Sequence, residues 1–243
     1  MLQHEMNEQL NPINAWLHGR RFKYVRNWLN LHYGHKQIKI LEIGVGYGRL
    51  VEELTPYLYI DYTGVELIEE LYQEAKRRLS NIPNCHLLNG SILDEEIIRQ
   101  LNNNYDVIIA LETCEHIPAQ EVPKLLGILR YRLHCKYFIS SVPIEIGPII
   151  LLKNFGSYLL HYGRYREYTV KDTIYAALGK IEKLSPHSGN SAYPSHKGFD
   201  WRFYRYLLHQ DFRIKQTLHL PLTWLPMALS TNVMFIAEPR TEI

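Results

Sequence analysis

The chain has 243 residues, which suits one large domain or one domain with an embellishment and leaves little room for two independent ones. Hydrophobic residues make up 46% of the sequence and charged residues 21%, values that exclude a disordered chain and allow a sizeable core. The formal net charge of +2 excludes a global field for nucleic acid or anionic lipid, so any such partner must be held locally.

Strands and helices are predicted to alternate along the first part of the chain. Apolar residues at helical spacing indicate an opening helical segment within residues 1–35. Short apolar runs then indicate strands, each of the first four followed by a helical pattern, at residues 38–43, 62–67, 85–88, 106–111 and 136–142. Such alternation predicts right-handed crossovers and a parallel sheet with helices on both faces.

The alternation stops between residues 144 and 198. The mixture of tyrosine, proline, serine and glycine there indicates an insertion, which we expect to lie over the carboxyl edge of the sheet as a lid. A helix at residues 201–208 and strands at 212–218 and 232–237 follow. Because only a short proline-containing loop joins these last strands, they are predicted to pair antiparallel.

The whole chain, residues 1–243, is therefore predicted to be a single α/β domain whose seven-stranded sheet is mainly parallel. The charge-free stretch from Gln216 to Ala237 is long enough to cross a membrane, but its prolines and polar residues favour two strands, so no transmembrane segment is expected. Cys85, Cys114 and Cys135 form no C-x-x-C pair, and the N-terminus has no apolar signal segment. These features predict a reducing, cytoplasmic location.

A glycine-rich turn follows the first predicted strand. Gly44, Gly46 and Gly48 occupy alternate positions between a strand and a helix, where the backbone can approach a nucleotide-like ligand closely. The dinucleotide fingerprint requires its third glycine where Arg49 stands, which disfavours a nicotinamide-dependent reductase. Glu66 closes the second strand, where a carboxylate can accept hydrogen bonds from both hydroxyls of a ribose.

With Glu42 before the glycines and Glu66 after the second strand, residues 38–142 resemble the class I S-adenosylmethionine-dependent methyltransferases. The resemblance implies a Rossmann-like fold and an enzyme that uses S-adenosylmethionine. It implies that the glycines wrap the methionine moiety, with Glu42 near its amino group, and that the turn around Ser91 flanks the adenine. The cofactor-binding residues that it implies are Glu42, Gly44, Gly46, Gly48, Glu66, Leu67, Ser91, Ile92 and Glu112. The family often has aspartate where Ser91 stands.

The fourth predicted strand ends in a cluster of acidic and imidazole groups. If a helical turn begins there, Glu112, Glu115 and His116 share one face. We expect His116 to act as the general base for a hydroxyl, with Glu115 orienting it, so both are candidate catalytic residues.

The spacing E-x-x-E-H is also similar to that of ubiquinone-biosynthesis O-methyltransferases and of small-RNA 3′-terminal 2′-O-methyltransferases, where it is associated with a divalent metal. The second group has a further, distant histidine, and this chain offers His196. A metal site of Glu112, Glu115, His116 and His196 is therefore the alternative to the base. It is disfavoured because the segment around His196 contains an extra glycine.

The predicted lid combines aromatic, cationic and aliphatic residues. The aromatic and cationic ones could stack on bases or a quinone ring, or pack onto the body of the domain: Tyr158, His161, Tyr162, Arg164, Tyr165, Arg166 and Tyr168. The run Ile149–Leu152 could likewise face a lipid-like substrate or pack within the lid.

The function predicted from the sequence is S-adenosylmethionine-dependent methyl transfer, with O-methylation of a small or lipid-linked metabolite preferred. Two alternatives stay open. One is a metal-dependent RNA 2′-O-methyltransferase, favoured by the E-x-x-E-H spacing and His196 but disfavoured by the net charge of only +2. The other is a partner subunit that binds S-adenosylmethionine without catalysing transfer.

Overall fold

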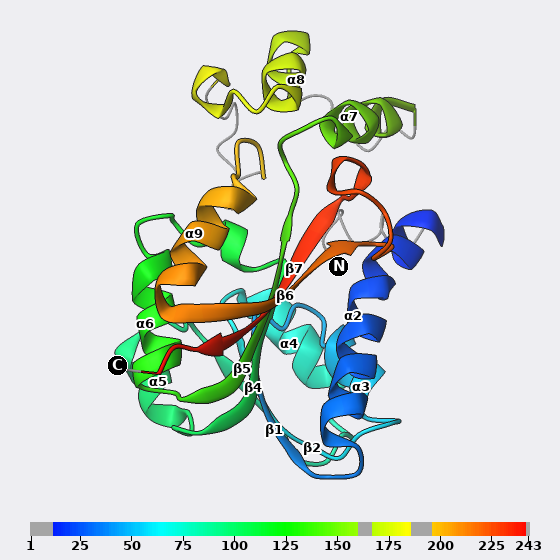
Figure 1. Ribbon diagram of the computed structural model, residues 1–243. Coiled ribbons are helices and arrows are strands. Elements are labelled where there is room, and N and C mark those ends of the chain that lie inside the picture. Colours follow the sequence, from blue (N-terminus) through cyan, green and yellow to red (C-terminus); the bar gives the residue numbers. More distant parts are fainter. Residues whose placement is uncertain (1–11, 160–166, 186–195, 242–243) are drawn as a thin grey trace.

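The computed structural model describes residues 12–159, 167–185 and 196–241 (Figure 1). Seven strands form one sheet in the order β3-β2-β1-β4-β5-β7-β6, with β7 antiparallel to both of its neighbours. The strands are β1 (Ile38–Ile43), β2 (Ile60–Glu66), β3 (Cys85–Asn89), β4 (Tyr105–Leu111), β5 (Cys135–Pro143), β6 (Phe212–Leu220) and β7 (Asn232–Pro239). The predicted Rossmann-like α/β fold is confirmed, including the antiparallel final pair.

Helices cover both faces of the sheet because successive side chains of each strand point to opposite faces. In β1, Ile38 and Ile40 join one core cluster and Leu41 and Ile43 join the other. The first cluster is closed by α2 (Pro12–Tyr33), α3 (Arg49–Leu54) and the end of α4 (Glu69–Arg78). The second cluster is closed by α5 (Glu95–Gln100), α6 (Val122–Tyr131) and α9 (Trp201–Asp211).

Where the sequence showed no regular pattern, the described part of the insertion after β5 forms two α-helices, α7 (Ile149–Leu159) and α8 (Val170–Ala177), and a 3₁₀ helix (Ile181–Lys183). A capping box starts α8, since the Thr169 side chain accepts from the Asp172 backbone N–H while the Asp172 carboxylate accepts from the Thr169 N–H. Both α-helices stand beyond the carboxyl edge of the sheet in Figure 1. The predicted aromatic and cationic residues 161–166 lie outside the described residues.

The charge-free stretch from Gln216 to Ala237 forms parts of β6 and β7 and the loop between them, as predicted. Among the helices that the structure describes, none combines the length and the hydropathy that a membrane span requires.

Candidate functional site

The glycine turn between β1 and α3 leaves open space at only its middle glycine. All three glycines have positive φ, of 76° at Gly44, 57° at Gly46 and 77° at Gly48. A Cβ atom at Gly44 would lie 2.3 Å from the Thr113 Oγ1 atom, so this glycine packs against the turn after β4. Around Gly46, in contrast, no atom of the described residues lies within 4 Å of the Cβ position, apart from those of Gly46 and its two chain neighbours. A ligand can therefore approach the backbone at Gly46.

Glu66 lies at the end of β2 with its carboxylate turned toward this open space. Its Oε2 atom accepts from the Gly46 N–H at 2.8 Å and its Oε1 atom from the Ile68 N–H at 2.9 Å. Burial raises the pKa of Glu66, and these backbone donors act against that shift. A carboxylate has about four acceptor positions, so this one retains the capacity to accept from a ligand hydroxyl. The neighbouring Leu67 is 67% exposed and offers an apolar surface for an aromatic ring.

The turn after β3 lies next to Glu66 because the Asn89 side chain donates to the Glu66 carbonyl at 3.1 Å. The Ser91 hydroxyl accepts from the Leu93 N–H at 3.1 Å and so stabilises the turn itself. Ile92 contributes its side chain to the core, where it is 4% exposed.

Glu42 is a buried carboxylate at the end of β1. Burial raises its pKa to about 8, although the Tyr62 hydroxyl donates to its Oε2 atom at 2.5 Å. The positive charge of Arg21 on α2 partly counters the rise and also acts on Glu112 and Glu115. Arg21 is not identifiable from the sequence, because one arginine on a helix rich in basic residues carries no local signal.

Glu112 follows β4 in a left-handed conformation with φ of 53°, which is rare for a residue with a side chain. Its Oε1 atom accepts from the Ser141 hydroxyl at 2.9 Å, and its Oε2 atom accepts from the Asn232 amide at 2.5 Å. The carboxylate therefore links the ends of β4, β5 and β7. The prediction that Glu112, Glu115 and His116 share one helical face is wrong. Glu115 and His116 lie in a short 3₁₀ turn, Cys114–His116, and Glu112 precedes that turn.

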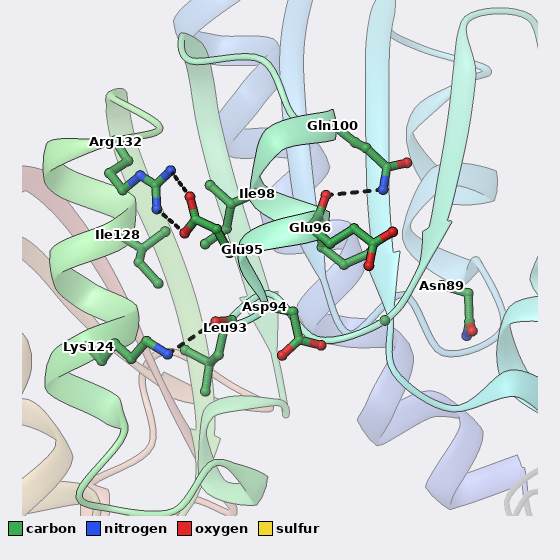
Figure 2. A pocket seen from close by; sticks show the side chains of 12 residues that line it. Asn89, Leu93, Asp94, Glu95, Glu96, Ile98, Gln100, Lys124, Ile128 and Arg132 are labelled. Atoms are coloured by element: carbon green, nitrogen blue, oxygen red, sulfur yellow. Dashed lines mark hydrogen bonds and ion pairs between the residues drawn. The ribbon is translucent and has the colours of Figure 1, made fainter.

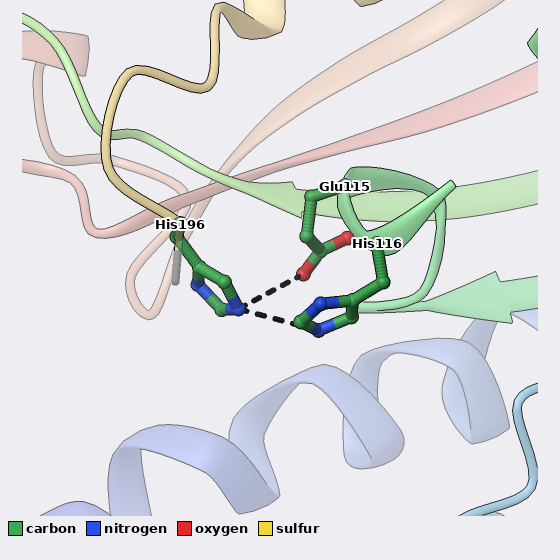
Figure 3. Close-up of side chains that lie close together, drawn as sticks. All are labelled: Glu115, His116 and His196. Carbon is green, nitrogen blue, oxygen red and sulfur yellow. Dashed lines mark hydrogen bonds and ion pairs between the residues drawn. The ribbon is translucent and has the colours of Figure 1, made fainter. Parts of the chain in front are cut away.

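Glu115, His116 and His196 converge although 80 residues separate the two histidines (Figure 3). The Nε2 atoms of His116 and His196 are 3.3 Å apart, and the Nε2 atom of His196 is 4.0 Å from a Glu115 carboxylate oxygen. One ligand atom from each of the three residues lies within 4.8 Å of the others. We call this the Glu115–His116–His196 group.

The Glu115 side chain is fully buried, and neither carboxylate oxygen has a hydrogen-bond partner in the part of the chain that the structure describes. Burial and the neighbouring Glu112 hold the pKa of Glu115 well above its ordinary value. Burial lowers the pKa of His116, which favours the neutral imidazole. A buried carboxylate without a donor is costly, so the group is built to receive a cation or a hydrogen-bond donor.

The segment that carries His196 is fixed to the insertion by a buried ion pair. Lys197 Nζ lies 3.0 Å from the Asp172 carboxylate and also donates to the Ser185 hydroxyl at 2.8 Å and the Glu167 carbonyl at 2.9 Å. The side chains of Lys197 and Asp172 are 4% and 3% exposed. Neither residue was predicted from the sequence, although Thr169-x-x-Asp172 is a recognisable capping signal.

A surface cavity of about 640 Å³ lies elsewhere, between α5 and α6 (Figure 2). Two of its charged residues pair with each other, since the Arg132 guanidinium donates to both oxygens of Glu95 at 2.6 and 2.8 Å. None of the site residues predicted from the sequence lines this cavity. It is therefore separate from the glycine turn and from the Glu115–His116–His196 group.

Comparisons with known proteins agree with this architecture. Residues 40–134 match the family model described as a methyltransferase domain. Comparison with curated proteins gives no match to the chain.

Among solved structures, magnesium protoporphyrin IX methyltransferase from Synechocystis PCC 6803 with bound SAH has 18% identity and a TM-score of 0.58, over 95% of this chain and 88% of that one. An S-adenosylmethionine-dependent methyltransferase from Clostridium acetobutylicum has 11% identity and a TM-score of 0.61, over 91% of each chain. The methyltransferase domain of bacterial CtHen1 has 14% identity and a TM-score of 0.57, over 91% of this chain and 99% of that one. At these identities the likeness shows a shared fold.

Proposed function

Because the chain carries a class I S-adenosylmethionine-dependent methyltransferase domain, we propose that it methylates a hydroxyl oxygen of a small or lipid-linked metabolite. The observation that carries the proposal is the Glu115–His116–His196 group, placed beside the glycine turn. The Thr113 hydroxyl joins the two parts, since it donates to the Ile43 carbonyl at 3.0 Å and packs against Gly44. Bound S-adenosylmethionine supplies a methyl group that its sulfonium charge has already activated.

Gly46, Glu66 and Leu67 would hold this cofactor. The open space at Gly46 admits a ligand, the remaining acceptor capacity of Glu66 suits a ribose hydroxyl, and exposed Leu67 suits the adenine ring. These residues fix the donor, so the protein has to align the acceptor oxygen with it and remove the hydroxyl proton.

Two roles are open to the Glu115–His116–His196 group in removing that proton. Neutral His116 can accept it directly, with the other two side chains orienting the imidazole. Alternatively, the carboxylate and the two imidazoles can hold a divalent cation, for which they are suitable ligands. A cation held there would supply a Lewis acid that makes the hydroxyl more acidic.

We favour the cation, although the sequence alone favoured the base. His196 reaches the group despite the extra glycine in its segment, and the buried Glu115 carboxylate has no donor among the described residues. A cation would coordinate that carboxylate together with the two imidazoles and would neutralise its charge.

The same three residues favour metal-dependent 2′-O-methylation of an RNA end as a second candidate function. His196 occupies the place that this candidate requires, beside Glu115 and His116. The net charge of +2 weighs against it, because RNA binding depends strongly on basic residues that neutralise phosphates. A hydroxyl of a metabolite therefore remains the preferred acceptor.

Methyl transfer from radiolabelled S-adenosylmethionine to a panel of acceptors tests the function. The panel contains phenols, polyols, lipid-linked hydroxyl compounds, amines and a short RNA with a free 3′ end. We expect label in hydroxyl compounds, with a methyl ether identified by mass spectrometry. Periodate resistance of the RNA end would instead identify the second candidate. Cofactor binding without transfer to any acceptor would favour a non-catalytic subunit, and transfer to amines alone would contradict the proposal.

Replacement of Glu66 by alanine should weaken binding of S-adenosylhomocysteine, measured by calorimetry, by about 1.5–3 kcal/mol, the value of hydrogen bonds to a charged group. Glu70→Ala, on the exposed first turn of α4, is the matched control and should bind as the wild type does. Unchanged affinity in folded Glu66→Ala would show that the ribose lies elsewhere.

A further inference from the structure

Helix α7 turns its apolar face away from the protein. Five large side chains on it are 49–62% exposed and recur at helical spacing: Leu151, Leu152, Phe155, Tyr158 and Leu159. The buried positions of the same helix are Ile149 and Ile150 at its start and, further along, the polar residues Asn154 and Ser157. A helix of a globular domain normally has the opposite arrangement, so this face is built for contact with something other than the domain itself.

Two neighbouring elements extend this apolar surface. The Lys153 ammonium of α7 donates to the Thr231 carbonyl at 3.0 Å, which places α7 against the β6–β7 loop. That loop exposes Trp224, which is 76% accessible, and Met227, which is 43% accessible. Helix α7 and the β6–β7 loop therefore contact each other, and both expose large apolar side chains to solvent.

Helix α2 adds a tryptophan and positive charge to the same region. The Arg20 guanidinium donates to the Pro221 carbonyl at 3.4 Å, which joins α2 to the β6–β7 loop. The exposed Trp16 lies one turn before it, and the Arg20 guanidinium is 5.6 Å from the ring centroid. Tryptophan is typical of surfaces that meet the boundary between lipid headgroups and acyl chains.

The charge of these segments has one sign. No aspartate or glutamate occurs in residues 12–33, 149–166 or 216–237. Among the described residues, α2 exposes Arg20 and Lys23, whereas Arg26 pairs with Glu53 and Lys153 pairs with Glu145. Two copies of such a surface would repel each other, whereas anionic lipid headgroups would attract it.

We propose that the outward face of α7, together with the β6–β7 loop, docks on the surface of a lipid bilayer that contains anionic headgroups. An amphipathic helix with basic neighbours lies in the plane of such a surface and buries its apolar side chains at the headgroup boundary. The docked face belongs to the insertion beyond the carboxyl edge of the sheet, so the site would open close to the membrane. The inference goes beyond the proposed function and does not depend on it, because docking requires neither cofactor nor acceptor.

Sedimentation of the full chain with vesicles tests the docking. We expect binding to vesicles of equal parts phosphatidylcholine and phosphatidylglycerol, and weaker binding to phosphatidylcholine alone or at high salt. The double variant Leu152→Glu with Phe155→Glu should bind at least ~10-fold more weakly. It loses two apolar side chains that the bilayer would bury, and it gains two negative charges that anionic headgroups repel. Leu31→Glu, on the distant half of α2 and 82% exposed in the wild type, is the matched control and should bind normally.

Unchanged melting temperature and S-adenosylhomocysteine affinity would show that the double variant is folded. Absence of wild-type binding to both vesicle types would overturn the inference, as would equal binding by the double variant. If the wild type forms a dimer that the double variant lacks, and neither binds vesicles, the face is a contact between two copies and the proposal is wrong. A protein that docks normally but methylates no hydroxyl would contradict only the proposed function.

Discussion

Replacement of His196 by alanine is expected to lower methyl transfer by roughly 10²–10⁴-fold, because the loss of a Lewis acid costs several kcal/mol of transition-state stabilisation. A chelator should silence the wild-type enzyme, and added manganese or zinc should restore it. Equilibrium dialysis should show that His196→Ala, His116→Ala and Glu115→Ala each retain less metal than the wild type. His86→Ala, an exposed histidine on β3, is the control and should keep both metal and activity.

Different outcomes would assign the Glu115–His116–His196 group differently. If chelation has no effect and only His116→Ala is strongly impaired, His116 is the general base and the other two residues orient it. If none of the three variants loses activity on the true acceptor, the group is part of the scaffold and the proposed chemistry is wrong.

Replacement of Lys197 by methionine is expected to destabilise the protein by about 3–5 kcal/mol, since it leaves the Asp172 carboxylate buried without its countercharge. For a chain of this length the melting temperature should fall by roughly 10 °C in calorimetry. Lys180→Met is the matched control, because Lys180 is an exposed lysine of the same insertion. It should leave the melting temperature unchanged.

A second variant separates the charge effect from a general loss of packing. Lys197→Met combined with Asp172→Asn should recover part of the lost stability, because neither charge then remains buried alone. If Lys197→Met has the same melting temperature as the wild type, the ion pair does not hold the insertion in place.

The sheet and the glycine turn were predictable because their signals are local. Strand β1 alternates between two buried faces, and Gly44, Gly46 and Gly48 follow it directly, so pattern and spacing alone identify both. The helices of the insertion were not predictable in the same way. In α7 most of the large apolar residues face solvent, and only Ile149 and Ile150 at its start are buried, so hydrophobic periodicity did not mark a side that packs against the domain.

The arrangement of the site depends on contacts between distant residues. Glu112 is held by Ser141 and Asn232, which lie 29 and 120 residues away, and no local pattern reports such partners. The resemblance to small-RNA 2′-O-methyltransferases indicated His196, but only the fold brings its Nε2 atom within 3.3 Å of the His116 Nε2 atom. Lys197 resembles a solvated loop lysine in the sequence, and its burial follows from the packing of α8 against the segment at residue 196.

The attachment of Lys197 to α8 has a thermodynamic consequence for the whole insertion. The body of the domain contributes Glu115 and His116 to the group, whereas the third member, His196, moves with the element to which Lys197 is bound. Any ligand that touches all three residues therefore ties the insertion to the sheet. The coupling is reciprocal. The free energy by which the bound ligand stabilises attachment of the insertion equals the free energy by which attachment of the insertion strengthens binding of the ligand. A substitution in α8 that loosens this attachment will weaken the ligand without contacting it.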